Sequence, residues 1–199
     1  MTRFLLIRHA ETNATGKRLS GRNKDVHIND EGNAQAQKLA ERLTKYPIDA
    51  IYSSSLERTI ETAAAIEKCK AIKNIVCDDF LEIDFGLWTN CLFTDLEKDP
   101  IFKRFNEFRS CTRIPGGETM LEAQSRMVSG LEKLKIKHPH QTVAVISHAD
   151  MIKAAIAFYA GIHLDVFHRL EISPCSISII ELYDETAIIK SVNDTGKIF

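Results

Sequence analysis

Short apolar runs alternate with amphipathic stretches along this chain of 199 residues. The run RFLLIR, residues 3–8, is apolar on both faces and too short for a helix, so it predicts a buried strand. The segment 176–192 alternates apolar and polar residues around Asp184, which predicts an antiparallel hairpin. Other buried strands are predicted at 48–53, 74–77 and 142–147.

Apolar residues at helical spacing fill the intervals between these strands. Ala36, Leu39 and Leu43 fit one helical face, and Ala123, Met127 and Leu131 fit another. The predicted helices run from an N-cap at Asp30 to Pro47, over 55–68 with Ser55 as the N-cap, from the PGGE of 115–118 onward, and over 150–161 with Gly161 at the end.

Strands that alternate with helices are typical of α/β proteins. We expect a three-layer α/β/α fold with a mostly parallel central sheet, an antiparallel edge hairpin and a small cap. The sequence shows no linker composition, low-complexity tract or repeat, so we expect a single domain over 1–199. Residues 88–116, rich in aromatic and charged residues, are predicted to form a cap insertion over the active site.

The composition excludes some classes of protein. Positive and negative charges nearly cancel, at 26 Lys plus Arg against 27 Asp plus Glu, which does not favour nucleic-acid binding. No apolar run approaches the roughly 18 residues of a membrane helix, and the N-terminus does not resemble a signal peptide. The five cysteines lack the spacing of disulfide frameworks or zinc sites, so we expect free thiols and a cytoplasmic protein.

Two predicted strands end in similar sequences, LIRHAE at 6–11 and VISHAD at 145–150. In parallel sheets, ligands bind outside the carboxyl ends of the strands, so His9 and His148 should share one edge. The strand 48–53 should bring Arg58 to the same edge through the turn that follows it. The echo itself allows three readings, which are coincidence, a pair of metal ligands, or a catalytic pair.

The arginines favour catalysis over metal binding. Arg58 is predicted in the first turn of a helix, where the helix dipole disfavours a cation, while Leu56, Ile60, Ala63 and Ala64 are expected to bury the other face. Together with Arg8 it predicts an anion site, because guanidinium groups bind phosphate oxygens in pairs. These cations would repel a metal ion, so we expect no metal site and chemistry of the phosphoryl-transfer kind.

The same residues resemble the signature of the histidine phosphatase superfamily, also called phosphoglycerate-mutase-like. LIRHAET resembles its Arg-His-Gly/Ala-Glu-Ser/Thr motif, and VISHAD resembles its Ser-His-Gly/Ala motif. Between them, IYSSSLERTIETA, LEIDFGLW and PGGET are similar to three further family segments, in the family's order. The chain is on this basis identified as a member of the family, similar to its small phosphatases, which include α-ribazole phosphatase and broad-specificity enzymes.

The resemblance implies a role for each matching residue. His9 would be the nucleophile that becomes a phosphohistidine, and Arg8, Arg58 and His148 would surround the phosphoryl group. Glu82 would be the general acid and then the base, with Asp84 as its rival in the same segment. Glu11 would position the turn of the nucleophile. The expected substrate contacts are Thr15, Ser20, Gly21 and Ala149.

The resemblance leaves more than one activity open. We expect hydrolysis of phosphomonoesters of small metabolites, without metal or organic cofactor and without nucleic-acid or membrane partners. A phosphoglycerate mutase needs a lid that keeps water out, and the seven residues after Val192 look too short to supply one. A mutase and a non-catalytic phospholigand-binding protein remain the alternatives. The substrate and the oligomeric state do not follow from the sequence.

The predicted cap also departs from the family pattern, since Trp88-Thr89-Asn90 replaces the usual Trp-Glu-Gly. We expect most of the cap's phenylalanines to form its own small core. Its arginines are candidates for contacts with further anionic groups of a substrate. The phenylalanines are Phe93, Phe102, Phe105 and Phe108, and the arginines are Arg104, Arg109 and Arg113.

Overall fold

The computed structural model describes residues 1–196. Its centre is a six-stranded sheet in the order β3-β2-β4-β1-β5-β6. The strands are β1 (Thr2–Arg8), β2 (Ala50–Ser53), β3 (Asn74–Val76), β4 (Thr142–Ser147), β5 (Ile177–Leu182) and β6 (Ala187–Asp194). The first four pair in parallel, whereas β5 runs antiparallel to β1 and β6 antiparallel to β5. The predicted mostly parallel sheet with an antiparallel edge hairpin is therefore confirmed.

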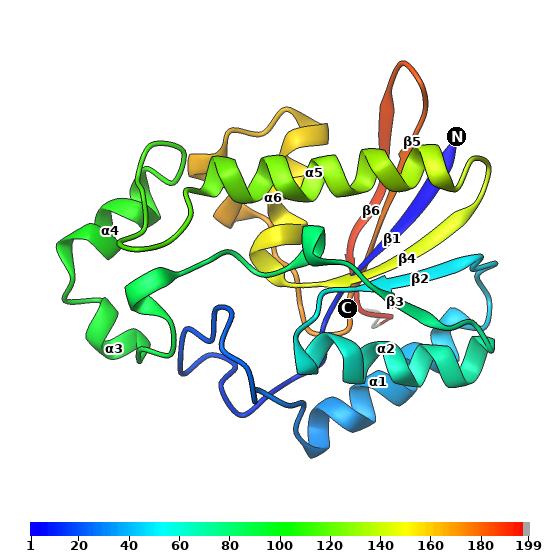
Figure 1. Ribbon diagram of the computed structural model, residues 1–199, viewed down its shortest axis with the longest axis horizontal. Coiled ribbons are helices and arrows are strands. Elements are labelled where there is room, and N and C mark those ends of the chain that lie inside the picture. The colour runs from blue at the N-terminus through cyan, green and yellow to red at the C-terminus, as the bar shows by residue number, and fades with distance from the viewer. Residues whose placement is uncertain (197–199) are drawn as a thin grey trace.

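Helices cover both faces of this sheet (Figure 1). The pair α1 and α2 lies on one face and the pair α5 and α6 on the other, which confirms the three-layer α/β/α architecture. The α-helices are α1 (Asp30–Leu43), α2 (Glu57–Lys70), α3 (Phe93–Leu96), α4 (Pro100–Glu107), α5 (Met120–Lys137) and α6 (Ala149–Ala160). The 3₁₀ helices are η1 (Asp78–Phe80), η2 (Gly86–Trp88) and η3 (Leu164–Arg169).

The continuous apolar run of β1 reflects burial on two sides. Phe4 and Leu6 pack in the core beneath α5 and α6, whereas Leu5 and Ile7 pack in the core against α1 and α2. All four side chains are at most 1% exposed. Burying each contributes roughly 1.5–3 kcal/mol, which anchors this strand in the middle of the sheet.

Two helix starts differ from the prediction. Asn29, and not Asp30, is the N-cap of α1, and its side chain accepts a hydrogen bond from the Gly32 backbone N–H at 2.8 Å. Asp30 is instead the first helical residue, where its charge still favours the positive end of the helix. The long helix α5 begins after the PGGE segment, with a capping box of Thr119 and Glu122.

The start of α2 was also predicted wrongly, and its buried face only in part. Its N-cap position is Leu56, which makes no side-chain cap, and Ser55 is exposed. Leu56 and Ala63 are buried as predicted, but Ile60 and Ala64 face outward, and Arg58 is only 2% exposed. The buried face of the helix therefore includes a cation beside its apolar side chains.

The carboxyl ends of three strands meet at one edge of the sheet. Arg8 is in register with Ser147, and the His9 backbone N–H donates to the Ser147 carbonyl at 3.0 Å. The Ser54 backbone N–H donates to the Ile146 carbonyl at 3.2 Å. The topology therefore brings the segments after β1, β2 and β4 together, as the sequence indicated.

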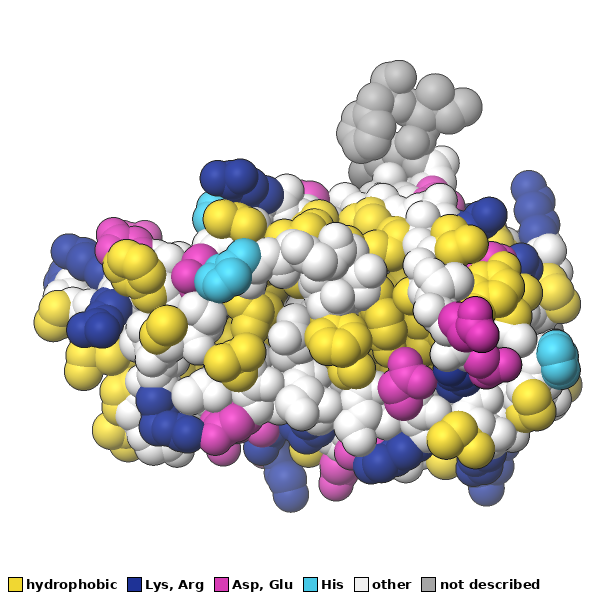
Figure 2. Space-filling model, turned by 90° about the horizontal axis from the view of Figure 1, so that it is seen from above, with side chains coloured by type: hydrophobic (Ala, Val, Ile, Leu, Met, Phe, Trp, Pro, Cys, Tyr) yellow, Lys and Arg dark blue, Asp and Glu magenta, His cyan; other side chains and the backbone are white. Residues whose placement is uncertain are grey.

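The segment 88–116 contains α3 and α4 and lies at one end of the molecule (green, left in Figure 1). Seen from above that view, hydrophobic side chains gather across the middle of the surface, and charged side chains lie mostly around its rim (Figure 2). Among residues 1–196, no helix has both the length and the apolar character that crossing a membrane requires.

Candidate active site

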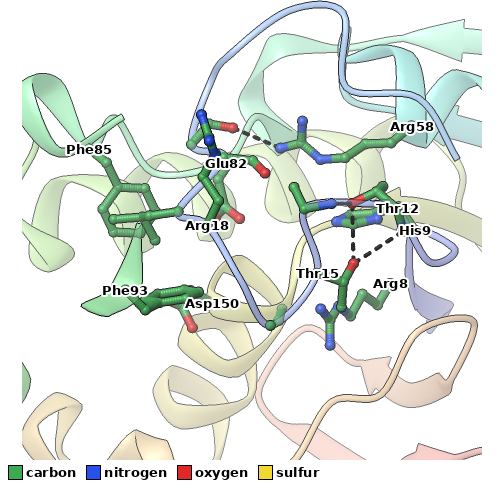
Figure 3. Close-up of a pocket in the computed structure, with 16 residues that line it drawn as sticks. Arg8, His9, Thr12, Thr15, Arg18, Arg58, Glu82, Phe85, Phe93 and Asp150 are labelled. Carbon is green, nitrogen blue, oxygen red and sulfur yellow. Dashed lines mark hydrogen bonds between the residues drawn. The ribbon is translucent and has the colours of Figure 1, made fainter. Parts of the chain in front are cut away.

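A cavity of about 180 Å³ opens at the edge where the three strands end (Figure 3). Of the predicted site residues, His148 alone does not line the cavity, because its ring is completely buried behind the wall. The residues that line it are Arg8, His9, Thr12, Ala14, Thr15, Gly16, Arg18, Leu19, Ser20, Gly21, Arg58, Glu82, Phe85, Phe93, Ala149 and Asp150. The structure thus brings together the side chains that the sequence placed at this edge.

His9 is held by the main chain in one orientation. Its Nδ1 lies 2.7 Å from the Ala10 carbonyl, and a carbonyl only accepts, so Nδ1 carries the proton and Nε2 keeps its lone pair. Burial lowers the pKa of His9 well below its ordinary value, and the charges of Arg58 and Arg8 lower it further. The imidazole is therefore neutral, which is the state that a nitrogen nucleophile needs.

Two guanidinium groups flank this histidine, that of Arg58 buried and that of Arg8 half-buried. Arg8 donates from Nη1 to the Ile172 carbonyl at 2.7 Å, and Arg58 donates from Nη2 to the Gly21 carbonyl at 2.7 Å. Within residues 1–196, Nε of Arg8 and Nη1 of Arg58 are buried without a hydrogen-bond partner. Unpaired buried N–H groups are costly, so these donors fit a ligand with several acceptor oxygens, such as a phosphoryl group.

His148 has both ring nitrogens engaged by side chains. Nδ1 lies 3.3 Å from Nη2 of Arg58, which can only donate, so Nδ1 is the acceptor and Nε2–H donates to Ser54 Oγ at 2.9 Å. Burial lowers the pKa of His148 well below its ordinary value, and Arg58 adds to the effect. The two histidine rings lie 5.3 Å apart between centroids.

Glu82 enters the cavity, and Asp84 does not. The Glu82 side chain is 14% exposed, and its Oε2 lies 3.9 Å from His148 Nδ1. Burial and, to a lesser extent, the negative charge of Asp150 raise the pKa of Glu82 to about 7, against the opposing charge of Arg58. Asp84 instead accepts from the Gly86 backbone N–H and pairs with Arg22. Of these two carboxyl groups, Glu82 is the one that lines the cavity with His9.

An ion-pair network that was not predicted from the sequence holds the Glu82 segment in place. Glu118 of the PGGE segment pairs with Arg22 at 2.9 Å and with Arg126 at 3.0 Å. Both arginines donate to the Glu82 carbonyl, and Glu118 accepts from the Asp84 backbone N–H. A Cβ on Gly117 would lie 2.2 Å from the Asp84 carbonyl oxygen, so the glycine permits this close approach. The PGGE motif therefore fixes the position of the Glu82 backbone, and we call the network of Glu118, Arg22 and Arg126 the brace of Glu118.

The loop after β1 supplies hydroxyl groups to the cavity. Thr15 Oγ1 accepts from the Thr12 backbone N–H at 3.1 Å, and the two hydroxyls lie 3.2 Å apart. Thr12 lines the cavity but was not singled out, although it belongs to the LIRHAET motif. Ser20 and Gly21 follow in the same loop, where the positive φ of Gly21, 53°, turns its carbonyl toward Arg58.

The outer side of the cavity carries residues that were not predicted as site residues. Figure 3 shows Arg18, Phe85, Phe93 and Asp150 on the side away from His9 and Arg8. Arg18 donates to Asn90 Oδ1 at 3.0 Å, within the tripeptide that departs from the family pattern. Phe85 and Asp150 belong to the LEIDFGLW and VISHAD motifs, and Phe93 is one of the cap phenylalanines, but only the fold shows that these residues and Arg18 line one side of the cavity.

The predicted cap contributes one aromatic ring to the cavity. Phe105 is 1% exposed and packs against Trp88, which also contacts Phe102, so it belongs to the cap's own core as expected. Phe93 lines the cavity, and Phe108 is 53% exposed. Arg104 is exposed, Arg113 pairs with Glu122, and Arg109 pairs with Asp150.

Metal-ligating side chains are not clustered at this site. Within residues 1–196, no three His, Cys, Asp or Glu side chains group closely enough to hold a metal ion. The cysteines Cys69, Cys77, Cys91, Cys111 and Cys175 are all free thiols.

This fold and this constellation define a class of protein. The chain belongs to the histidine phosphatase superfamily, because the model of its branch 1 matches residues 4–195. It is 33% identical over 199 residues to phosphoserine phosphatase 1 of Hydrogenobacter thermophilus, with 98% of this chain and 93% of the relative covered. The resemblance inferred from the motifs is therefore confirmed.

Solved structures show the same architecture. A mutant phosphoserine phosphatase from Entamoeba histolytica, in complex with phosphoserine, matches with a TM-score of 0.86 at 25% identity and covers 98% of each chain. A putative α-ribazole-5'-P phosphatase from Escherichia coli matches with a TM-score of 0.87 at 22% identity, over 98% of this chain and 97% of that chain. The second likeness concerns the fold alone.

Proposed function

We propose that this protein is a phosphomonoester hydrolase that acts on small phosphorylated metabolites through a phosphohistidine at His9. The observation that carries the proposal is the neutral His9 ring beside two arginines with buried, unpaired N–H groups. Such a site joins a nucleophile to a preformed anion clamp. The relatives named for phosphoserine support a small phosphorylated substrate.

In the first step, the Nε2 lone pair of His9 forms a bond to phosphorus while the bond from phosphorus to the ester oxygen breaks. The protonated Glu82 carboxyl gives its proton to the departing oxygen, so the alcohol leaves uncharged. Arg8 and Arg58 surround the phosphoryl oxygens, where charge is spread in the transition state, and His148 holds the Arg58 guanidinium from behind the cavity wall. Donation from His9 Nδ1 to the Ala10 carbonyl stabilises the phosphorylated ring.

In the second step, the Glu82 carboxylate takes a proton from a water molecule as that water attacks phosphorus. The bond between His9 Nε2 and phosphorus breaks, inorganic phosphate leaves, and the neutral histidine and the protonated Glu82 return. A carboxyl group with a pKa of about 7 suits both directions, because each protonation state is well populated near neutral pH.

The positive charge that stabilises the phosphoryl group comes from the two arginines in this scheme, so we propose that catalysis needs no metal ion. Residues 88–116 would act as the cap that shapes the outer side of the cavity, through Phe93. The five free thiols support a reducing compartment, and we place the protein in the cytoplasm.

The test is hydrolysis of p-nitrophenyl phosphate by the purified protein in the presence of EDTA. We expect turnover that EDTA leaves unchanged and, on rapid quenching, an acid-labile phosphoryl group on His9 detected by mass spectrometry. Absence of turnover across a wide pH range would contradict the proposal. Interconversion of 3- and 2-phosphoglycerate faster than phosphate release would instead identify a mutase.

A further inference from the structure

Asp150 adds a negative charge to a cavity whose arginines favour the binding of an anion. It lies in the first turn of α6 and lines the same cavity as Arg8, His9 and Arg58. A carboxylate there repels a phosphoryl group, so it opposes the binding that the arginines provide. Departures from local consistency of this kind are typical of functional positions.

Pairing with Arg109 leaves most of the hydrogen-bonding capacity of the Asp150 carboxylate unused. Among residues 1–196, its side chain pairs with Arg109 alone, across 3.4 Å from Nη1 to Oδ2. Arg109 is itself held by Asn106 at 2.6 Å, and it stacks over the rings of Phe105 and Phe167. An ionised carboxylate offers about four acceptor sites, so Asp150 keeps room for another donor.

The Asp150 carboxylate is open to the cavity and close to the reacting groups. Its side chain is 25% exposed, and its charge acts on both Glu82 and Arg8. Figure 3 shows it on the side of the cavity away from His9 and Arg8. His9 and the two arginines hold the phosphoryl group in the proposed mechanism, so the alcohol half of a substrate extends toward the side of the cavity where Asp150 lies.

We propose that Asp150 is a specificity-determining residue that accepts hydrogen bonds from an ammonium group on the alcohol half of the substrate. The preferred substrates are then phosphomonoesters of amino alcohols, O-phospho amino acids among them. Arg18, on the same side of the cavity, gives a carboxylate on such a substrate a cationic partner. This inference rests on the proposed phosphatase function and names its substrate class.

O-Phospho-L-serine and 3-phosphoglycerate test the inference, because they differ only in an ammonium or a hydroxyl group at one carbon. We expect wild type to favour phosphoserine in kcat/KM by about 10- to 100-fold, the worth of a charge-assisted hydrogen bond. Asp150→Asn should bring the ratio close to one. Asp95→Asn removes an exposed charge from α3 outside the cavity and should leave the ratio unchanged.

Equal losses on both substrates in Asp150→Asn would overturn the inference, because a residue that only tunes the pKa of Glu82 cannot tell them apart. A wild-type preference for 3-phosphoglycerate would overturn it without any variant. The same ligand pair can be titrated calorimetrically against His9→Ala, with and without Asp150→Asn. Binding then tests Asp150 even if turnover of p-nitrophenyl phosphate is absent, a result that would instead refute the proposed function.

Discussion

His9 and His148 follow neighbouring parallel strands in similar sequences, but their surroundings differ. One nitrogen of His9 is fixed by a backbone carbonyl, and the other has no partner within residues 1–196. Both nitrogens of His148 are fixed, one by Ser54 and the other by Arg58. The end of each strand places a histidine ring at the edge of the sheet. The hydrogen-bond partners then decide whether the ring can attack phosphorus, as proposed for His9, or only holds neighbouring side chains, as His148 does.

The chain segments that follow the two histidines also differ. His9 leads into a loop whose residues line the cavity, whereas His148 is the N-cap residue of α6. His148 is completely buried, and His9 is 7% exposed. The pKa of each is lowered well below its ordinary value, so both are neutral near pH 7 and their division of labour is geometric.

Replacing the two histidines in turn should give the largest effects. We expect His9→Ala to lower kcat by at least about 10⁴-fold and to abolish the phosphoenzyme, because the nucleophile is lost. His148→Asn should lower kcat by about 10²- to 10³-fold, because the Arg58 guanidinium, a donor to the transition state, loses the ring that orients it, and the phosphoenzyme should still form. Quench-flow labelling distinguishes the two. A phosphoenzyme in His9→Ala would mean that another residue attacks.

Glu82→Gln should give the next effect, and its size should depend on the leaving group. We expect a loss of about 10²- to 10⁴-fold on an alkyl phosphate and a smaller loss on p-nitrophenyl phosphate, whose phenolate leaves without a proton. The pKa of Glu82 is raised to about 7, so the acid form is lost as pH rises through 7. Wild-type kcat/KM on alkyl phosphates should fall about tenfold per pH unit above that point.

The variant should lack this alkaline limb, because glutamine does not titrate. Asp84→Asn is the matched control, since its carboxylate faces away from the cavity and it should keep both the limb and the leaving-group dependence of wild type. An alkaline limb that persisted unchanged in Glu82→Gln would assign the general acid elsewhere.

Ser54→Ala should give the smallest effect and tests how His148 is held. Loss of the bond from Nε2–H to Ser54 Oγ leaves a buried donor unpaired, at about 1–3 kcal/mol. We expect kcat to fall about 10-fold and thermal stability to decrease. Ser55→Ala is the control, since Ser55 is exposed, and it should match wild type. Equal behaviour of the two variants would show that the Ser54 contact does not orient His148.

Strands, helices and strand-end residues were predictable because they rest on local patterns. The period of apolar residues marks buried strands, and a parallel sheet brings their ends to one edge. The buried face of α2 was predictable only in part, since Leu56 and Ala63 are inside, whereas Ile60 and Ala64 are outside and the structure buries Arg58. That burial depends on the Gly21 carbonyl, which lies in a loop far away in sequence.

The brace of Glu118 and the acid at Asp150 were missed for a related reason. The PGGE segment looked like the start of a helix, but Glu118 reaches Arg22 and Arg126 through contacts between distant segments. Asp150 is the last residue of the second histidine motif, VISHAD, and its charge is locally favourable at a helix N-terminus. Its position in the cavity emerges only when the segments from the first loop, the cap and α6 meet.

The position of β1 in the sheet has a consequence for how this protein is made. β1 is synthesised before the other five strands of the sheet, yet both its partners, β4 and β5, come from the last third of this sequence. Pairings so distant in sequence slow folding, because the chain entropy of closing the loop is lost before the contacts form. Arg8 and His9 therefore leave the ribosome well before the strands that fix their places, and the apolar strand beside them stays unpaired until β4 and β5 follow.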